Sequence, residues 1–314
     1  MFAFPNPDYE AQAWFREALA KTDGKMRRAA MDRFVPAFHD RYNSHMKAPA
    51  PDHVVRLDGE VADAALRRLQ EDGYSLTRID EAQKARLVAL TADTAEGVLA
   101  RLPEHSSKAL GEAQALLERE EHAEVFETLD AIFTAQNLYA VASAYCGRAL
   151  TLAPRAAVQV NTAAHSRSMY GEIEADGLPV EKTRYLHIDS SGWPWIKVLI
   201  YLTPVGPEQG PFRYVAGSHR LASPFELSVR KTNDKLRLPA KFFVALPEPF
   251  RMNTHFGDHA AVDDPRMEAL LRNERTVCDG ASDLILFDNN GVHRGGFVRE
   301  GRRYMMQCFL KPEA

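Results

Sequence analysis

The chain has 314 residues, of which 45% are hydrophobic, so it can bury a substantial core, and its formal net charge is -4. Lysine and arginine are scattered rather than clustered, which argues against nucleic acid as a partner. The three cysteines form no CxxC pair, so neither a disulfide framework nor a zinc knuckle is indicated.

The first residues, MFAFPNPDYEAQAWF, lack the charged start and continuous apolar run of a signal peptide. No stretch of about eighteen apolar residues occurs, so no membrane association is expected. The sequence therefore predicts a cytoplasmic protein in a reducing compartment.

The first half of the chain has apolar residues at helical spacing among Ala, Glu, Arg and Lys, in residues 8–35 and 59–150. One short strand is predicted at 74–79, directly after a helix stop at Asp72-Gly73. We therefore expect a helix-rich part over residues 1–147.

After Gly147 the pattern changes to short apolar or alternating runs separated by Gly, Pro and Asn, which is typical of strands. These runs are residues 150–160, 195–205, 283–289 and 302–310. Residues 221–278 are rich in charge and proline, and they predict an insertion of the kind that forms a lid or binding wall. We expect a single α+β domain over 1–314, with helices packed on a β core at 148–314.

A candidate metal site begins at His187 and Asp189, in the segment RYLHIDSSG. If this segment is a strand end, positions i and i+2 place the imidazole and the carboxylate on one face. Two imidazoles and one carboxylate form the facial triad of non-haem Fe(II) oxygenases, and His293 in LFDNNGVHRGG is the best candidate for the third ligand. An isolated HxD pair is more often structural, so the triad depends on the surrounding pattern.

That surrounding pattern resembles the phytanoyl-CoA dioxygenase family. In chain order it comprises the HxD pair, Gly210-Pro211, the corner Gly217-Ser218-His219-Arg220, a distal histidine and a following arginine. The resemblance covers residues 155–311, with a weaker match at 71–74. It implies a double-stranded β-helix, a jelly-roll relative of the cupins, with Fe(II) in the mouth of the barrel, 2-oxoglutarate as cosubstrate and O2 as oxidant. Short strands with Gly/Pro turns agree with such a fold.

An arginine is needed to bind the far carboxylate of 2-oxoglutarate through two parallel hydrogen bonds. Arg299, Arg302 and Arg303 compete for this role. If Glu300-Gly301 forms a two-residue turn, Arg302 shares a face with His293 and Arg303 points away. The family pattern also selects Arg302, so this residue is the predicted cosubstrate anchor; a solvated turn charge is the alternative.

Other side chains are weaker candidates. The resemblance implies that Gln159 and Asn161 contact 2-oxoglutarate, although amides that bond a neighbouring strand are more common. Trp193 and Trp195 follow the metal motif and are candidate walls of the substrate pocket, or core residues. His219 matches a corner histidine of the family that is usually structural.

One rival metal motif, His255 and His259 at helical spacing, lacks the Glu of HExxH and contains Gly257. No GxxxxGK[ST], GxGxxG after a strand, or GxSxG pattern occurs, so nucleotide-binding and hydrolase functions have no motif support.

The expected function is an oxidoreductase, a 2-oxoglutarate-dependent dioxygenase that hydroxylates a small organic molecule and releases succinate and CO2. The carboxylate of Asp189 favours hydroxylation over halogenation, because related halogenases have a small residue there. The alternatives are a cupin-like metal or small-molecule binding protein without turnover, and a metal-dependent hydrolase or isomerase. Substrate identity and oligomeric state do not follow from the sequence.

Overall fold

In a computed structural model of the protein, the residues that the structure describes are 59–102, 114–164, 195–220, 272–278, 283–296 and 298–312. Their helices are α3 (Glu60–Asp72), α4 (Glu81–Arg101), α5 (Ala123–Ala135), α6 (Leu138–Cys146) and a short 3-10 turn (Ser218–Arg220). Their strands are β1 (Tyr74–Thr77), β2 (Gln114–Glu118), β3 (Thr151–Leu152), β4 (Arg155–Thr162), β5 (Ile196–Tyr201), β6 (Phe212–Val215), β7 (Glu274–Val277), β8 (Leu284–Asp288), β9 (His293–Gly295) and β10 (Arg302–Lys311).

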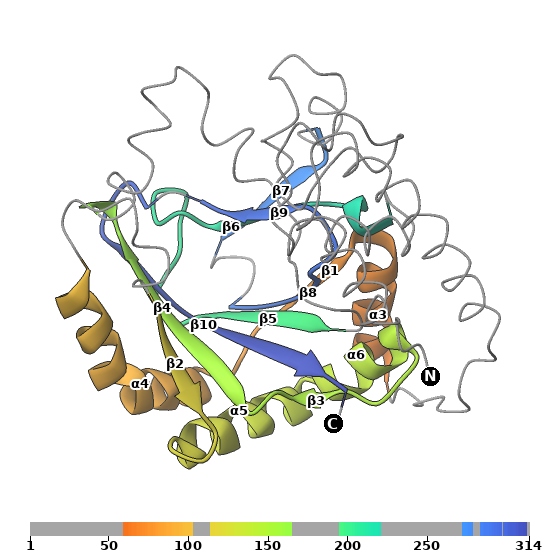
Figure 1. Cartoon of the computed structure of the whole chain (residues 1–314). Coiled ribbons are helices and arrows are strands. Elements are labelled where there is room, and N and C mark those ends of the chain that lie inside the picture. The colour runs from red at the N-terminus through yellow and green to blue at the C-terminus, as the bar shows by residue number, and fades with distance from the viewer. Residues whose placement is uncertain are drawn as a thin grey trace, which may run out of the picture.

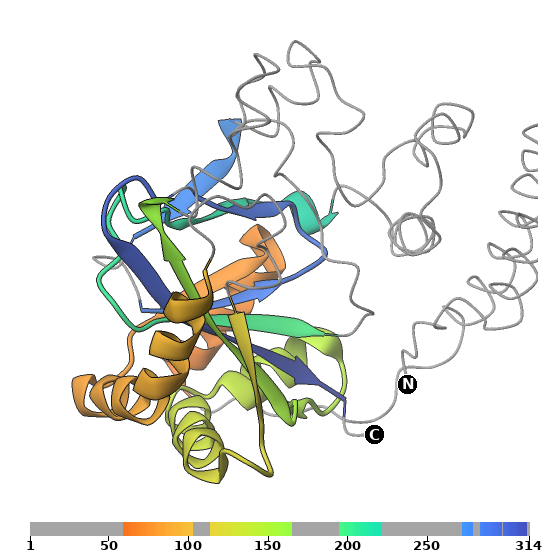
Figure 2. The same cartoon turned by 60° about the vertical axis from the view of Figure 1, so that its left-hand side comes forward.

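The strands form two antiparallel sheets. The larger has seven strands in the order β1, β8, β5, β10, β4, β2, with β3 paired to β10; the smaller has the order β7, β6, β9. Helices α4, α5 and α6 lie on one side of the larger sheet and the smaller sheet lies on the other (Figures 1 and 2). The described fold is therefore α+β, as the sequence predicts.

The two faces of the larger sheet carry different cores, as the two-residue period of a strand requires. On β10, Met306 and Cys308 pack with helix residues in the first core, whereas Met305 packs in a second core. That second core joins Ile285 and Phe287 of the larger sheet to Phe212 of the smaller one. Even-numbered residues of β10 thus face the helices, and odd-numbered residues face the space between the sheets.

Local signals explain the start and end of the helices beside the sheet. Asp80 caps α4, since its carboxylate accepts from the backbone N–H of Ala82 at 2.9 Å and of Gln83 at 3.2 Å. Helix α3 ends at Asp72, and the next residue, Gly73, caps it with a left-handed φ of 85° and an N–H that donates to the carbonyls of Arg68 and Leu69. The predicted stop at Asp72-Gly73 and the strand that follows it are confirmed.

The expected insertion at 221–278 ends earlier than the sequence suggests, because residues 274–277 are strand β7. This strand pairs antiparallel with β6, with Phe212 opposite Val277. Residues 221–271 lie outside the described part, so the rest of the insertion stays a prediction.

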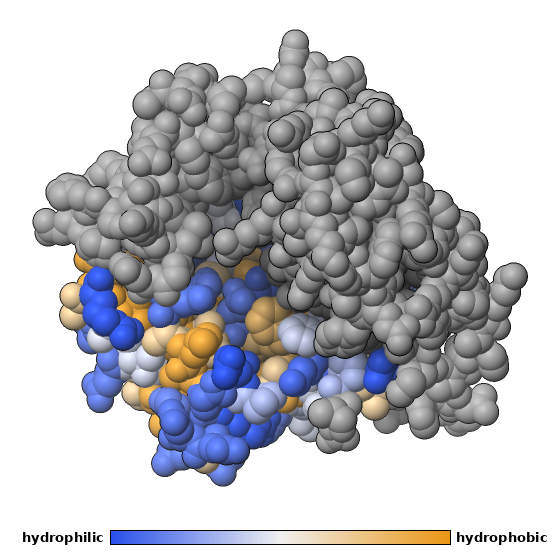
Figure 3. Space-filling model, in the orientation of Figure 1, coloured by the Kyte–Doolittle hydropathy of each residue, from blue (hydrophilic) through white to orange (hydrophobic). Residues whose placement is uncertain are grey.

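Large hydrophobic side chains are exposed at two described positions, Val61 on α3 and Leu116 on β2. These elements lie at opposite sides of Figure 1, so the two residues do not form one patch. On the face drawn in Figure 3, the described surface mixes hydrophilic and hydrophobic residues. No described helix is both long and apolar enough to cross a bilayer.

The three cysteine thiols differ in their burial. Cys146 and Cys308 are buried, and Cys278 is partly exposed. Burial raises the pKa of the Cys308 thiol to about 12 and raises the pKa of Cys146 as well, so both stay protonated at pH 8. We expect a thiol reagent at pH 8 to label Cys278 in the native protein and all three cysteines after denaturation, as counted by mass spectrometry. Fast native labelling of a Cys278→Ser variant would contradict this assignment.

Candidate functional site

His293 lies in the space between the two sheets. It begins β9 of the smaller sheet, opposite Tyr214 of β6, and is 3% exposed. Its ring stacks on Tyr214 at 6.4 Å and meets the edge of Phe287, on the larger sheet, at 5.1 Å. Aromatic side chains of both sheets therefore hold the predicted distal metal ligand in an apolar layer.

The hydrogen bond of His293 determines which ring nitrogen can act as a ligand. Its Nδ1 lies 2.8 Å from the carbonyl oxygen of Gly291. A carbonyl oxygen only accepts, so Nδ1 carries the proton and Nε2 carries the lone pair in the neutral ring. A histidine that donates one N–H to a backbone carbonyl has the tautomer and orientation typical of a metal ligand.

Gly291 occupies a position that only glycine fits. A Cβ built there would lie 1.7 Å from the hydroxyl oxygen of Tyr214. That hydroxyl donates to the carbonyl of Asp288 at 3.0 Å, and the next backbone N–H, of Val292, donates to the Ser218 hydroxyl at 2.7 Å. The segment that carries His293 is thus fixed on both sides, and Ser218 gives the predicted Gly-Ser-His corner a structural function.

Arg303, rather than Arg302, points between the sheets. Arg303 is 7% exposed and lies opposite Asn161 of β4, whose side-chain oxygen accepts from its Nη2 at 3.1 Å. Its Nη1 donates to the backbone carbonyls of Gly210 and Gly296. A Cβ on Gly295, two residues after His293, would be 3.5 Å from Nη2, so the guanidinium lies beside the β9 strand.

Arg302 lies on the opposite face of β10, and the prediction that it shares a face with His293 is wrong. Its side chain is 53% exposed and sits 3.5 Å from Glu96 of α4. The prediction assumes that the segments carrying His293 and Arg302 form one hairpin, but β9 belongs to the smaller sheet and β10 to the larger. The chain crosses between sheets here, so counting residues across a turn does not give the face.

The two amides predicted on β4 both point between the sheets. Asn161 contacts Arg303, as described above. Gln159 donates to Gln114 of β2 at 3.1 Å and to Gln307 of β10 at 3.5 Å. Gln159 therefore makes the interstrand contacts that were the alternative for this residue, and its contact with a cosubstrate stays a prediction.

Aromatic residues and one lysine line the inner face near the start of β5. The Trp195 ring meets Phe309 edge-on at 5.8 Å. Lys197, opposite Phe309 in the register, places its Nζ 5.5 Å from that ring and 5.9 Å from Phe287. Phe287 also contacts His293, so a single side chain separates Lys197 from the predicted metal ligand.

His219 bonds to a helix. Its Nε2 lies 3.1 Å from the carbonyl of Gln70 on α3, in agreement with a structural function. Five other predicted candidates, His187, Asp189, Trp193, His255 and His259, lie outside the described residues. Within the described residues, no three His, Cys, Asp or Glu side chains gather as a metal site. The complete triad therefore stays a prediction.

Sequence reasoning missed Asp288 and the position of Arg303. The sequence of β10 does not assign its faces, because the strand is buried on both sides, with Met305 in the second core and Met306 in the first. For Asp288 the signal was a carboxylate at the end of the apolar run LILFD, where a charge is costly unless it is bonded.

The sequence matches no protein-family model and no curated protein. Among solved structures, it is similar to AviO1 from Streptomyces viridochromogenes Tue57, with 15% identity, coverage of 81% of this chain and 96% of that one, and a TM-score of 0.44. It is similar to the non-heme alpha ketoglutarate dependent carbocyclase SnoK from nogalamycin biosynthesis, with 16% identity, coverage of 83% of this chain and 87% of that one, and a TM-score of 0.46. It is also similar to HygX from Streptomyces hygroscopicus with nickel and 2-oxoglutarate bound, with 15% identity, coverage of 79% of this chain and 86% of that one, and a TM-score of 0.44. Scores below 0.5 at such identities are too low to assign a function.

Proposed function

We propose that the chain is an Fe(II)- and 2-oxoglutarate-dependent oxygenase that hydroxylates a small organic molecule. The observation that carries the proposal is the placement of a tautomer-fixed histidine and a buried arginine in the same layer, on facing sheets. His293 and Arg303 are both below 10% exposed. His293 belongs to the sequence pattern that resembles phytanoyl-CoA dioxygenases, whereas the arginine of that pattern is Arg302, the neighbour of Arg303. The two facing antiparallel sheets suit the double-stranded β-helix that this resemblance implies.

The described residues fit an iron ion at His293. The Nδ1–H bond to Gly291 leaves Nε2 as the coordinating atom, and the aromatic rings around it limit access of water. His187 and Asp189 would supply the other two ligands and complete a facial triad with open positions. Bound Fe(II) would couple decarboxylation of 2-oxoglutarate to oxidation of the substrate by O2.

The described residues also fit 2-oxoglutarate at Arg303. The carbonyls of Gly210 and Gly296 and the amide of Asn161 hold the guanidinium in one orientation. A guanidinium fixed in this way can bind a carboxylate through two parallel hydrogen bonds with little loss of side-chain entropy. Arg303 would therefore bind the far carboxylate, leaving the keto acid end for the metal.

We propose that the substrate binds beside Trp195 and Phe309, which would line part of its pocket. Lys197 lies between these two rings and His293, and Trp193 would be a further wall. They would exclude water and orient the substrate. Hydroxylation is the reaction we expect, because the sequence keeps a carboxylate at Asp189.

The test is an anaerobic titration of the purified apoprotein with Fe(II) and then 2-oxoglutarate. We expect the weak visible charge-transfer band of the chelated cosubstrate to appear in the wild type and to be lost in His187→Ala. A folded, iron-loaded wild type without the band would contradict the proposal and favour metal binding without turnover.

A further inference from the structure

Asp288 carries a buried carboxylate at the end of β8 and is 3% exposed. Its Oδ1 accepts from the backbone N–H of Asn290 at 2.8 Å and from the Asn290 side-chain amide at 2.6 Å. Its Oδ2 accepts from the hydroxyl of Tyr145, on α6, at 2.7 Å. Both oxygens are therefore bonded, as a buried carboxylate requires.

The hydroxyl of Tyr145 is suited to this contact because it stays protonated. Burial, and then the nearby charge of Asp288, raise the pKa of Tyr145 far above its ordinary value. The hydroxyl thus remains a donor at neutral pH. Helix α6 is thereby connected to the end of β8 by a charge-assisted hydrogen bond.

The backbone of Asp288 is held as firmly as its side chain. Its N–H donates to the carbonyl of Gly73, at the end of α3, at 2.9 Å. Its carbonyl accepts from the hydroxyl of Tyr214 and from the N–H of Gly291, both at 3.0 Å. Helices α3 and α6 and the smaller sheet all converge on this one residue.

These contacts lead directly to the metal ligand. Asp288 closes the tight turn 288–291, and the carbonyl of Gly291 at its end accepts from Nδ1 of His293. The direction of that carbonyl sets the rotation of the imidazole ring, and so the direction of its Nε2 lone pair. A small rearrangement of the turn would redirect the coordinating atom.

We propose that Asp288 and Tyr145 are positioning residues that orient His293 for metal binding, so the helical part of the chain contributes to the metal site. This inference rests on the proposed function, in which His293 is a ligand. Neither residue contacts the metal in this arrangement; both act through the Gly291 carbonyl.

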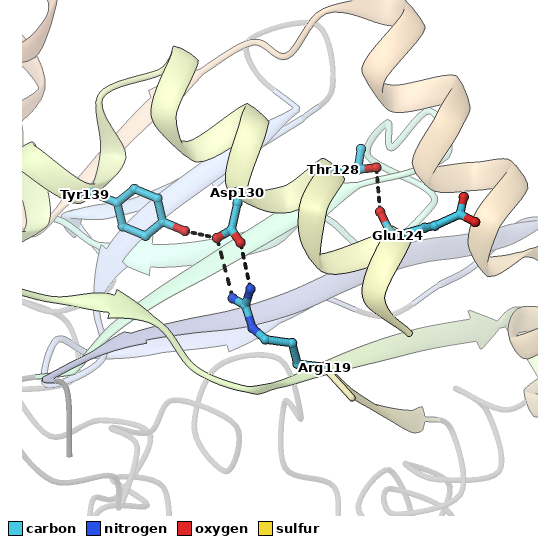
Figure 4. Close-up of polar contacts among 5 residues, drawn as sticks. All are labelled: Arg119, Glu124, Thr128, Asp130 and Tyr139. Carbon is cyan, nitrogen blue, oxygen red and sulfur yellow. Dashed lines mark hydrogen bonds and ion pairs between the residues drawn. The ribbon is translucent and has the colours of Figure 1, made fainter. Parts of the chain in front are cut away.

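Helix α6 also provides a matched control. Tyr139, six residues before Tyr145, donates its hydroxyl to Asp130 of α5, and Asp130 also pairs with Arg119 at 2.7 Å (Figure 4). Tyr139→Phe and Tyr145→Phe therefore remove the same hydroxyl from the same helix and leave an aspartate without that donor. Only Tyr145 is connected to the turn before His293.

The experiment measures Co(II) binding to the anaerobic apoprotein by its visible absorption, together with thermal unfolding midpoints. We expect Tyr145→Phe to raise the Co(II) dissociation constant about 10-fold and to shift the absorption band, whereas Tyr139→Phe changes the constant less than about 2-fold. If Tyr145→Phe does not fold, Asp288→Asn tests the same contact, because it keeps an acceptor for Asn290 and removes the charged oxygen to which Tyr145 donates.

The possible results separate this inference from the proposed function. Equal Co(II) affinities in Tyr145→Phe and Tyr139→Phe, with binding still lost in His293→Ala, would overturn the positioning function alone. A wild type that binds Co(II) no better than His293→Ala would overturn the metal site and the inference together. A selective loss in Tyr145→Phe at similar unfolding midpoints supports the inference.

Discussion

Replacing His293 with alanine is expected to abolish specific metal binding and all 2-oxoglutarate turnover. The imidazole is buried between the sheets with its tautomer set by Gly291, and the substitution removes the described side chain that we propose as a metal ligand. Loss of a direct ligand should exceed the roughly 10–100-fold loss of metal affinity typical for changes to outer partners. Isothermal titration with Fe(II) or Co(II) under anaerobic conditions measures this loss.

His219→Ala is the matched control for this substitution. His219 also donates to one backbone carbonyl, that of Gln70 at 3.1 Å, but it packs against α3. We expect His219→Ala to lower the unfolding midpoint and to keep the wild-type metal affinity. If the two alanine variants bind metal equally well, His293 is not a ligand.

Arg303→Met is expected to raise the 2-oxoglutarate concentration needed for half-maximal turnover by about 30-fold or more. Removing one partner of a buried charged hydrogen-bonded pair costs ~2–5 kcal/mol, and 1.4 kcal/mol corresponds to a factor of about ten. Methionine keeps most of the volume of the side chain, so packing beside Gly295 should change little. Titration of the charge-transfer band with 2-oxoglutarate gives the affinity without a known substrate.

Arg302→Met is the neighbouring control, since it makes the same change on the other face of β10. Its ion pair with Glu96 joins two exposed side chains, and such pairs contribute about 0–1 kcal/mol. We expect less than about a 3-fold change in 2-oxoglutarate affinity. The opposite ranking of the two variants would restore Arg302 as the cosubstrate anchor.

Much of the fold followed from local patterns. The strands β1, β5 and β8 lie within runs that the sequence predicts, and β4 and β10 extend one or two residues past theirs. The apolar residues of these runs are bounded by Gly, Pro or Asn. The helical texture of the first half is likewise confirmed in α3, α4, α5 and α6. These elements have a periodicity that agrees with their final environment.

Strand β2 was missed, and its residues explain why. Gln114–Glu118 reads QALLE, a run of good helix formers. It forms a strand because it pairs along β4, from Gln114 opposite Gln159 to Glu118 opposite Arg155. Such pairing is a tertiary effect that local propensity does not contain.

For the candidate site, the sequence selects residue types, and its prediction of which face Arg302 occupies is wrong. His293 was selected by the need for a third ligand, and the structure places it in a buried position that suits one. The prediction places Arg302 on the wrong face because the connection from β9 to β10 changes sheets. A shift of one residue along a strand moves a side chain to the opposite face of the sheet. Assigning the face of Arg302 therefore requires the long-range topology.

The change of sheet between β9 and β10 also sets a length scale. Packed sheets are about 10 Å apart, and Arg303 crosses that gap from β10 to the carbonyls of Gly210 and Gly296, beside β9. Under the proposed function, the apolar layer of Phe212, Phe287 and Met305 sets the spacing of the two sheets, and therefore how far the Arg303 guanidinium reaches toward the cosubstrate. Selectivity for the cosubstrate would then reside in hydrophobic residues that never touch its carboxylates.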